Sequence, residues 1–275
     1  MQNLSRRILT AIALVVPLVA ALYLLPTAWL LPVFGVIVFA GALEWAGLIG
    51  LRGGAGVAYA FVITGVGAGV SAVVLARPSF VWPVLLIACV WWLWALRDLG
   101  RDRGLYHARA TQALAGALVL IPMWVAALFL HAADTKRPLA LLFVLVLVWA
   151  ADSLAYFAGK NFGRTKLAPR VSPGKTIEGV LGGLVGVVLI AYFCGTILWQ
   201  LVGARLAAWM GLVVVVTLVS VLGDLVESKV KRVAGVKDSG TLLPGHGGVL
   251  DRIDALTSAI PVFALGWLML FNIPT

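Results

Sequence analysis

Long apolar stretches alternate with short polar segments along the whole chain. A helix needs about 20 apolar residues to cross a hydrocarbon core of about 30 Å. We expect membrane-spanning helices at residues 8–25, 27–48, 55–76, 80–96, 110–131, 138–158, 177–200, 205–226 and 250–272. The third stretch is rich in glycine, which weakens its helical pattern. The pattern predicts an all-α, polytopic membrane protein with about nine transmembrane helices.

Composition supports this class. Hydrophobic residues make up 62% of the 275 positions, charged residues make up 12%, and the mean hydropathy is +1.06, values far from those of soluble domains. Arg6 and Arg7 precede the first apolar stretch as they would in a signal peptide, but no convincing cleavage site follows. We therefore interpret this stretch as a retained anchor. Cys89 and Cys194 lie within apolar stretches and indicate neither a disulfide nor a metal site.

Basic residues indicate the orientation. If the N-terminus is cytoplasmic, nearly all of the 21 lysines and arginines fall on the cytoplasmic side, as the positive-inside rule requires. The exceptions are Arg77, Lys136, Arg137 and Arg205. The net charge of +10 is then mostly a consequence of topology. No basic patch with interleaved aromatic residues indicates nucleic acid binding.

We divide the chain into two parts. Residues 1–135 hold about five predicted helices and form a lipid-facing scaffold, in which Glu44 is the one acid embedded in a predicted span. A packing or interhelix hydrogen-bond role for Glu44 stays open. Residues 136–275 form the predicted catalytic half, and their charged loops at 159–176 and 227–249 would both face the cytoplasm.

Asp152 stands inside the sixth predicted span. An acid at such a position is expensive unless it meets a wet cavity, a cation or a hydrogen-bond donor. Tyr156 lies four residues later and so on the same helical face. A structural hydrogen bond to a neighbouring helix would explain Asp152, but we favour a role in which it faces a ligand.

The loop at 159–176 is strongly basic. No acid lies between Asp152 and Glu178, and Thr176 can cap the next helix, whose dipole attracts anions. The basic residues are Lys160, Arg164, Lys166, Arg170 and Lys175. The tripeptide at 174–176 resembles part of a P-loop, but Pro169 occupies a required glycine position and a membrane helix, not a strand, precedes the loop. An ordinary positive-inside loop is the alternative to an anion site.

The helix predicted after this loop carries a pattern of small residues. Glycines recur at four-residue spacing, at 179 and 183 and again at 182 and 186. Such pairs let a neighbouring helix approach closely.

The segment 224–254 concentrates acidic residues. Asp224 and Glu227 lie three apart at the end of one predicted helix, and Asp251 and Asp254 lie three apart at the start of the next, so each pair shares a helical face. Carboxylates at two facing helix ends suit Mg²⁺, which keeps coordination sites for phosphates. Glycines at 245, 247 and 248 would allow close backbone approach to a ligand.

These residue types indicate phosphoryl or nucleotidyl transfer, because carboxylates would hold the metal and the lysines and arginines of the intervening loop would hold phosphates. The alternative is that charged helix ends merely reach toward the membrane interface. That alternative explains scattered lysines but not clustered aspartates.

Residues 228–254 resemble the signature of the phosphatidate cytidylyltransferases, also called CDP-diacylglycerol synthases. The segment reads Ser-Lys-Val-Lys-Arg, then four residues, then Lys-Asp-Ser-Gly-Thr-Leu-Leu-Pro-Gly-His-Gly-Gly-Val-Leu-Asp-Arg-Ile-Asp. Residues 152–160 and 172–179 also resemble segments of that family, so the likeness spans about 140–255. The first half of the chain resembles the family only in hydropathy.

The resemblance implies a membrane enzyme that makes CDP-diacylglycerol and pyrophosphate from CTP and phosphatidic acid in phospholipid biosynthesis. It implies Mg²⁺, with a second cation such as K⁺ nearby, and a bacterial-type plasma membrane with the N-terminus and the active site cytoplasmic. Asp224 and Asp251 match the family's metal-binding acids. A homodimer stays open.

We assign the remaining site residues from charge and proximity in sequence. Asp254 would support the metal acids or bind the second cation, Asp152 would face the bound substrates, and Arg252 would pair with an aspartate. The residues expected around the CTP phosphates are Lys160, Ser172, Lys175 and Thr176. The residues expected around phosphatidate and pyrophosphate are Lys231, Arg232, Lys237 and His246.

Rival functions remain. A CTP-dependent polyprenol or dolichol kinase would transfer the γ-phosphoryl group, and a CDP-lipid synthase of archaeal type would use an ether lipid. An ion-coupled transporter would use Asp152 and Glu44, but transporters usually place their sites at the midplane between repeats. We see no repeat in this sequence.

Overall fold

The computed structural model describes residues 13, 15–101, 108–134, 138–242 and 247–271. Within these residues, eight helical segments are long and apolar enough to cross a membrane, so the prediction of an all-α, polytopic membrane protein is confirmed. They are α2 (Thr27–Leu48), α3 (Gly54–Ala76), α4 (Val81–Asp98, extended by the 3₁₀ turn Pro78–Phe80), α5 (Arg109–Ala133), α6 (Leu139–Phe162), α7 (Ile177–Ile197), α8 (Gly203–Val233) and α9 (Leu250–Phe271).

The predicted spans match these helices closely, including the glycine-rich third one. The first predicted span, 8–25, corresponds to a shorter apolar helix, Val15–Leu24, and its beginning lies outside the described residues.

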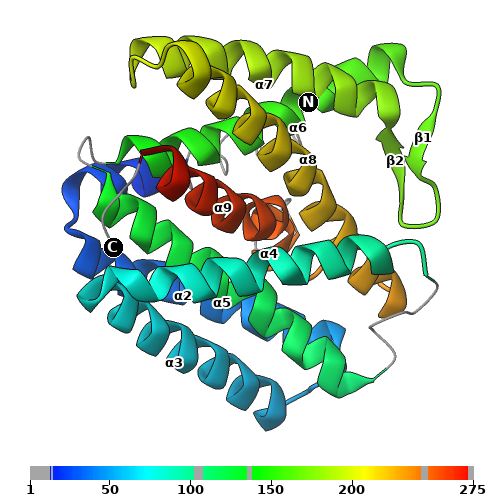
Figure 1. Ribbon diagram of the computed structural model, residues 1–275. Coiled ribbons are helices and arrows are strands. Elements are labelled where there is room, and N and C mark those ends of the chain that lie inside the picture. The colour runs from blue at the N-terminus through cyan, green and yellow to red at the C-terminus, as the bar shows by residue number, and fades with distance from the viewer. Residues whose placement is uncertain (1–12, 14, 102–107, 135–137, 243–246, 272–275) are drawn as a thin grey trace.

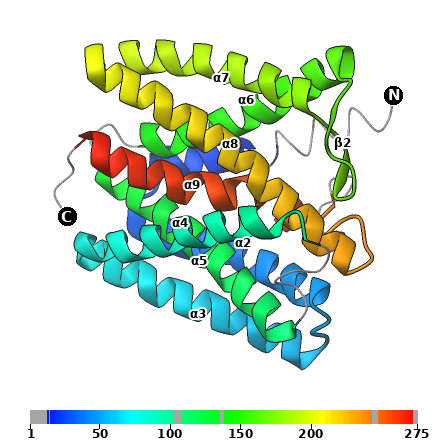
Figure 2. The same cartoon turned by 45° about the vertical axis from the view of Figure 1, so that its right-hand side comes forward.

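Helix α9 occupies the centre of the bundle. It packs against α8, α5, α4, α6 and α2, and Figure 1 shows it between α7 on one side of the molecule and α3 on the other. The same order is visible after rotation in Figure 2. The two ends of α9 differ in chemistry, because Asp251 and Asp254 stand in its first turns while Trp267 and Phe271 close an aromatic cluster at the other end.

A short β-hairpin stands at the end of the bundle where α8 finishes (Figure 1). Its strands, β1 (Lys166–Ala168) and β2 (Ser172–Thr176), are antiparallel and pair Lys166 with Thr176. We predicted a loop at 159–176. Instead, α6 continues to Phe162, and most of the remaining residues form the hairpin. The hairpin carries Ser172 and Lys175 on one short, defined strand.

The C-terminal end of α8 corrects a second expectation. We placed residue 227 and those after it in a loop, but α8 continues to Val233. The charges do not stop the helix because they have partners: Lys231 pairs with Glu227 one turn earlier, and Lys229 reaches Asp98 of α4. The helix ends where Gly235 adopts a left-handed φ of 74°, a conformation that glycine accepts most easily.

The glycine pattern of α7 lies against α6, as the sequence predicts. A Cβ on Gly179 would stand 2.8 Å from the backbone oxygen of Ala155, and one on Gly183 would stand 2.9 Å from that of Ala151. The two backbones are thus nearly in contact, and no side chain separates them. This packing fixes the position of α6, and with it Asp152, relative to the hairpin that leads into α7.

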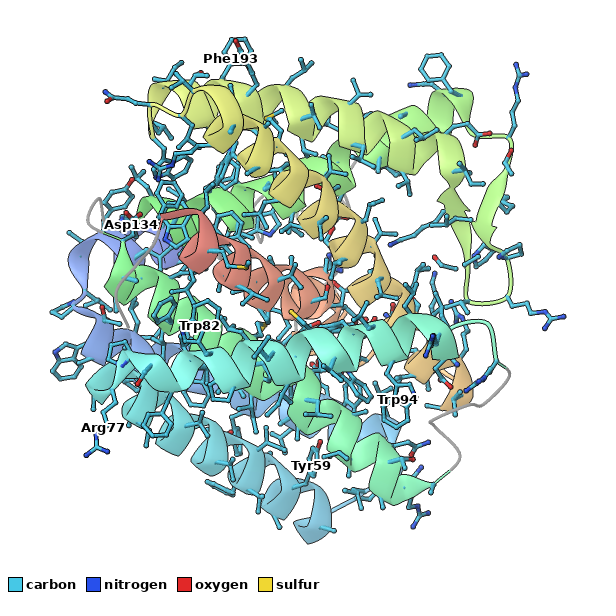
Figure 3. All side chains as sticks on the ribbon, viewed as in Figure 1. Tyr59, Arg77, Trp82, Trp94, Asp134 and Phe193 are labelled. Atoms are coloured by element: carbon cyan, nitrogen blue, oxygen red, sulfur yellow. The ribbon has the colours of Figure 1, made fainter. Side chains whose placement is uncertain are left out.

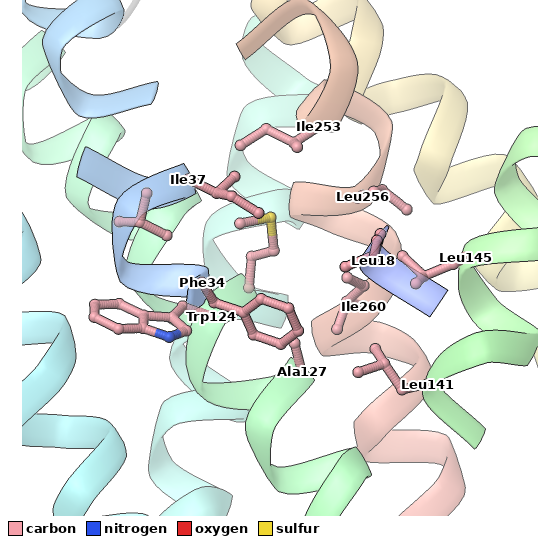
Figure 4. Close-up of a pocket in the computed structure, with 12 residues that line it drawn as sticks. Leu18, Phe34, Ile37, Trp124, Ala127, Leu141, Leu145, Ile253, Leu256 and Ile260 are labelled. Atoms are coloured by element: carbon pink, nitrogen blue, oxygen red, sulfur yellow. The ribbon is translucent and has the colours of Figure 1, made fainter. Parts of the chain in front are cut away.

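Next to the end of the bundle that carries the acids of α8 and α9, an apolar cavity lies inside the bundle. Helices α2, α5, α6 and α9 surround a cavity of about 80 Å³, which Figure 4 shows with Ile37 of α2 and Ile253 of α9 on the same side. Trp124 of α5 fills the space beside it and lies against Gly35 of α2 and Gly67 of α3. The cavity lies directly beneath the first turns of α9.

Candidate active site

Lys231 joins the ends of α8 and α9. Its ammonium lies 2.5 Å from Glu227 Oε2 and 2.6 Å from Asp251 Oδ1. All three side chains are at least nine-tenths buried. A buried charge of this kind is tolerated because it is paired on both sides. Lys231, which we expected to meet phosphatidate, thus bridges two carboxylates in this structure.

Asp251 is held by backbone amides as well as by Lys231. Its Oδ2 accepts hydrogen bonds from the amides of Ser239 at 3.0 Å and Gly248 at 2.8 Å. Gly247 adopts a φ of 79°, and a Cβ there would lie 2.7 Å from Asp251 Oδ2. Two of the glycines that we expected to approach a ligand, Gly247 and Gly248, therefore lie against the carboxylate of Asp251, and Gly245 lies outside the described residues.

Asp224 forms the second lysine–carboxylate pair. Lys175 extends from β2 so that its ammonium lies 2.6 Å from Asp224 Oδ2, and each side chain is about one quarter exposed. Ser228, one turn further along α8, donates to Asp224 Oδ1 at 3.2 Å. The pair brings together a strand residue and a helix residue that are 49 positions apart in sequence.

Two further aspartates lie near this pair. Asp152 of α6 is exposed and interacts electrostatically with both Lys175 and Asp224. Asp254 of α9 interacts with Asp224 and Asp152, and its Oδ1 accepts a hydrogen bond from the amide of Ala255 at 2.7 Å. Carboxylates from α6, α8 and α9 therefore share one neighbourhood with a single hairpin lysine.

Thr176 caps the start of α7 as predicted. Its Oγ1 accepts the amide hydrogen of Gly179 at 3.1 Å. The carboxylate of Glu178, in the first turn of α7, accepts hydrogen bonds from the amides of Arg164 and Thr165, each at 3.1 Å. These bonds tie the segment after α6 to the start of α7 and so hold the base of the hairpin in place.

A wide groove of about 640 Å³ opens between the hairpin turn and the ends of α4 and α8. The groove is cationic, with no acid among the described residues that line it, and its basic residues are Arg101, Arg170, Lys229 and Arg232. Arg232 also donates to the backbone oxygens of Val171 at 3.3 Å and Val236 at 3.2 Å. It thereby fastens the hairpin turn to α8.

The ion pair behind this groove was missed by the sequence interpretation. Lys229 Nζ lies 2.9 Å from Asp98 Oδ2 and 2.5 Å from the backbone oxygen of Asp98, and both side chains are buried. No sequence signal connects the two residues, because Asp98 lies at the start of a short segment, residues 97–109, in which acidic and basic residues are mixed. The pair anchors the end of α4 to the end of α8.

The other predicted residues lie around these pairs. Lys160, Lys237 and Arg252 are exposed on the same charged end, and Ser172 is partly buried at the start of β2. His246 lies outside the described residues.

The acids are of the kind that magnesium binds, because its protein ligands are oxygen atoms. Among the described residues, no group of three His, Cys, Asp or Glu side chains is placed to hold a metal by itself. Mg²⁺, however, commonly takes one or two carboxylates and completes its shell with water and substrate phosphates. Glu227 adds an unusual feature, because its Oε1 is buried without a hydrogen-bond partner, so the charged end has acceptor capacity left over.

Comparison with known proteins identifies the family. The model of the "Cytidylyltransferase family" matches residues 5–270. The chain belongs to this family. Membership places the chain among the nucleotidyltransferases. The match includes the first half of the chain as well as the second.

Named relatives agree with this membership. The phosphatidate cytidylyltransferase of Pseudomonas aeruginosa is 44% identical over 268 residues, which cover 95% of this chain and 96% of that protein. The phosphatidate cytidylyltransferase of Haemophilus influenzae is 56% identical over 126 residues, or 45% of this chain and 44% of that protein. That of Thermotoga maritima is 44% identical over 124 residues, or 44% of this chain and 46% of that protein.

Proposed function

We propose that this cytidylyltransferase is a phosphatidate cytidylyltransferase, which makes CDP-diacylglycerol and pyrophosphate from CTP and phosphatidic acid in phospholipid biosynthesis. One observation carries the proposal. The residues that resemble the signature meet in space as two lysine–carboxylate pairs, Lys175–Asp224 and Lys231–Asp251, at one end of a bundle of membrane-length helices. The similarity to the Pseudomonas aeruginosa enzyme along nearly the whole chain supports it.

The chemistry needs alignment and charge neutralisation more than proton transfer. The phosphate of phosphatidic acid is already an oxyanion, so one of its oxygens can attack the α-phosphorus of CTP without a general base. A new P–O bond forms there while the bond from the α-phosphorus to the β-bridging oxygen breaks, and that oxygen leaves with the pyrophosphate. Preorganised cations that face the developing charge supply most of the rate enhancement in such reactions.

The carboxylates would hold the metal. We assign Asp224 and Asp251 to Mg²⁺, with Asp254 supporting them or binding a second cation such as K⁺. When bound, Mg²⁺ would neutralise phosphate charge and orient the α-phosphate. Lys175 and Lys231 already reach these acids, so each stands where a phosphate bound beside the acid would meet an ammonium group.

The hairpin and the cationic groove would bind the remaining phosphates. Lys160, Ser172 and the helix start shaped by Thr176 lie on the hairpin side, where we place the triphosphate of CTP. Arg232, Lys237 and His246 would surround phosphatidate and the leaving pyrophosphate. Asp152, exposed beside Lys175, would face the bound substrates.

The charge distribution supports a cytoplasmic site in a bacterial-type plasma membrane. The hairpin and the end of α8 share the end of the bundle that carries most of the basic residues, as cytoplasmic loops do. CTP is a cytosolic nucleotide and phosphatidic acid lies in the leaflet, so a polar site at that surface would be open to both.

Labelled CTP tests the proposal directly. The purified protein in mild detergent, with Mg²⁺ and phosphatidic acid, should move label from the α-phosphate of CTP into lipid, and Asp224→Asn and Asp251→Asn should strongly reduce the transfer at the same Mg²⁺ concentration. Label moving from the γ-phosphate would instead identify a lipid kinase. No transfer by folded protein to either a diacyl or an ether-linked acceptor would refute the proposal.

A further inference from the structure

Glu44 connects the first half of the chain to the signature segment. It lies near the end of α2, is only 7% exposed, and accepts three hydrogen bonds from residues far along the chain. The amide of Val249 donates to Oε1 at 2.9 Å, and the amide of Leu250 donates to Oε2 at 2.8 Å. The hydroxyl of Ser239 also donates to Oε2, at 3.0 Å. Glu44 therefore caps the start of α9 from another helix.

The same two backbone segments donate hydrogen bonds to both Glu44 and Asp251. The hydroxyl of Ser239 donates to Glu44, and its amide donates to Asp251. The amide of Gly248 donates to Asp251, and the amides of the next two residues donate to Glu44. A shift of this backbone away from Glu44 would thus withdraw the amides that orient Asp251.

Close contact between α2 and α9 makes this arrangement possible. Gly41, one turn before Glu44, lies beside Ile253, whose Cδ1 would be in ordinary van der Waals contact, at 3.6 Å, with a Cβ at that position. A Cβ on Gly240 would lie 2.6 Å from Glu44 Oε1, so the signature backbone also closes directly over the carboxylate. Ile37 of α2 and Ile253 of α9 also line the same cavity (Figure 4).

We propose that Glu44 is a positioning residue for the reaction, which fixes the start of α9 so that Asp251 presents its carboxylate in the orientation needed for catalysis. The inference about catalysis rests on the proposed function, whereas the structural part does not. A negative charge at a helix N-terminus is favourable in itself. Here that interaction also orders the loop that contacts a catalytic acid.

Glu44→Gln is the variant that tests the inference. It keeps the size of the side chain, but one oxygen becomes an amide nitrogen, which cannot accept a hydrogen bond from the backbone. At least one of the amides of Val249 and Leu250 must then lose its acceptor. Mutation of a residue that supports a metal ligand typically lowers activity or metal affinity by about 10- to 100-fold. We therefore expect kcat to fall by at least about tenfold and the Mg²⁺ concentration for half-maximal activity to rise.

Asp134→Asn provides a matched control. Asp134 is also a buried acid, 4% exposed, and its Oδ2 accepts the amide of Ala140 at 2.7 Å near the start of α6. Figure 3 places Asp134 at the opposite end of the bundle from the hairpin. This variant should lower thermal stability but leave kcat and the Mg²⁺ requirement of the folded enzyme unchanged.

Hydrogen exchange separates positioning from a general loss of stability. In metal-free protein, we expect the amides of Val249 and Leu250 to exchange about tenfold faster in Glu44→Gln, since a hydrogen bond to a charged group is lost, while α6 exchanges as in the wild type. Ser239→Ala removes only the hydroxyl bond to Glu44 and should produce a smaller change in the same direction. It also serves as the test if Glu44→Gln does not fold.

The outcomes are distinct. Unchanged exchange at the start of α9 in both variants, or a kcat loss in Asp134→Asn equal to that in Glu44→Gln at matched stability, would overturn the positioning role. If the wild type transfers no cytidylyl group, the proposed function fails, yet the exchange data still decide whether Glu44 orders the start of α9.

Discussion

The ammonium of Lys175 lies 2.6 Å from the carboxylate of Asp224, and this contact joins the hairpin to the membrane helix that carries the acids. The hairpin itself is short and projects from the bundle (Figure 2). Its placement over the site therefore depends on a few directed contacts, of which this ion pair and the bond from Arg232 to Val171 are examples.

Lys175→Ala should lower kcat/KM by at least about 100-fold, the loss that follows removal of one donor from a site that stabilises transition-state charge. Lys166→Ala is the matched control, because Lys166 is an exposed lysine on the neighbouring strand and should retain most of the activity. Initial rates with α-labelled CTP measure both. Equal losses in the two variants would mean that the hairpin contributes only general positive charge.

Removal of divalent metal should abolish transfer, and Mg²⁺ should restore it. If Asp224 holds the ion, Asp224→Asn should raise the Mg²⁺ concentration for half-maximal activity by at least about tenfold, since even groups that merely support a metal ligand have effects of that size. A titration of activity against Mg²⁺ after EDTA treatment checks this. An unchanged Mg²⁺ requirement in an active Asp224→Asn protein would exclude this residue as a ligand.

The buried Asp98–Lys229 pair should show strong coupling. Lys229→Met or Asp98→Asn alone breaks a buried ion pair and should lower the free energy of unfolding by about 3–5 kcal/mol. The double variant should lose less than the sum of the two. Unfolding titrations of all four proteins give the coupling free energy directly, and additive losses would show that the two side chains act independently.

Close packing of α6 and α7 predicts that a single methyl group is harmful. Gly183→Ala places a Cβ 2.9 Å from the backbone oxygen of Ala151, and such overpacking typically costs about 1–3 kcal/mol. Gly211→Ala is the control, since nothing lies within 4 Å of its added Cβ. Alanine is more favourable than glycine inside a helix by about 1 kcal/mol, so this variant should be more stable. Thermal unfolding should thus move in opposite directions for the two variants, and similar shifts would contradict tight packing at Gly183.

The proposed orientation can be tested with single cysteines. In a background with Cys89 and Cys194 changed to alanine, Lys237→Cys should react with a membrane-impermeant maleimide only after the cells are permeabilised. Arg77→Cys, at the other end of the bundle (Figure 3), should react in intact cells. The reverse pattern would invert the topology and place the signature segment outside.

Hydropathy predicted the helices well because the membrane requires long apolar segments, and this requirement is local in sequence. It failed where tertiary contacts decide. The end of α8 carries Lys229 and Lys231, which resemble loop residues in sequence, yet each is paired with an acid and remains helical. The hairpin was missed because it is short and its strands have no apolar alternation.

The sequence indicated which residue types would gather at one end of the bundle, but not how they pair. The acids at 224 and 251 are brought to the same end of the bundle, whereas Lys231 proved to bridge two carboxylates, and Lys175 proved to reach an acid from another element. Glu44 was recognisable as an embedded acid, and the interhelix hydrogen-bond role left open for it is the one observed. Its partners could not be foreseen, because they lie about 200 positions away.

The cap that Glu44 places on α9 also bears on how this enzyme could be recombined. A chimaera that takes residues 1–135 from one relative and 136–275 from another would cut the chain between an acceptor and all three of its donors. Such a hybrid would be expected to work only when the incoming first half supplies a carboxylate at the same place, beneath the start of α9. With the role proposed for Glu44, residues 1–135 contribute to catalysis and are not an exchangeable membrane anchor.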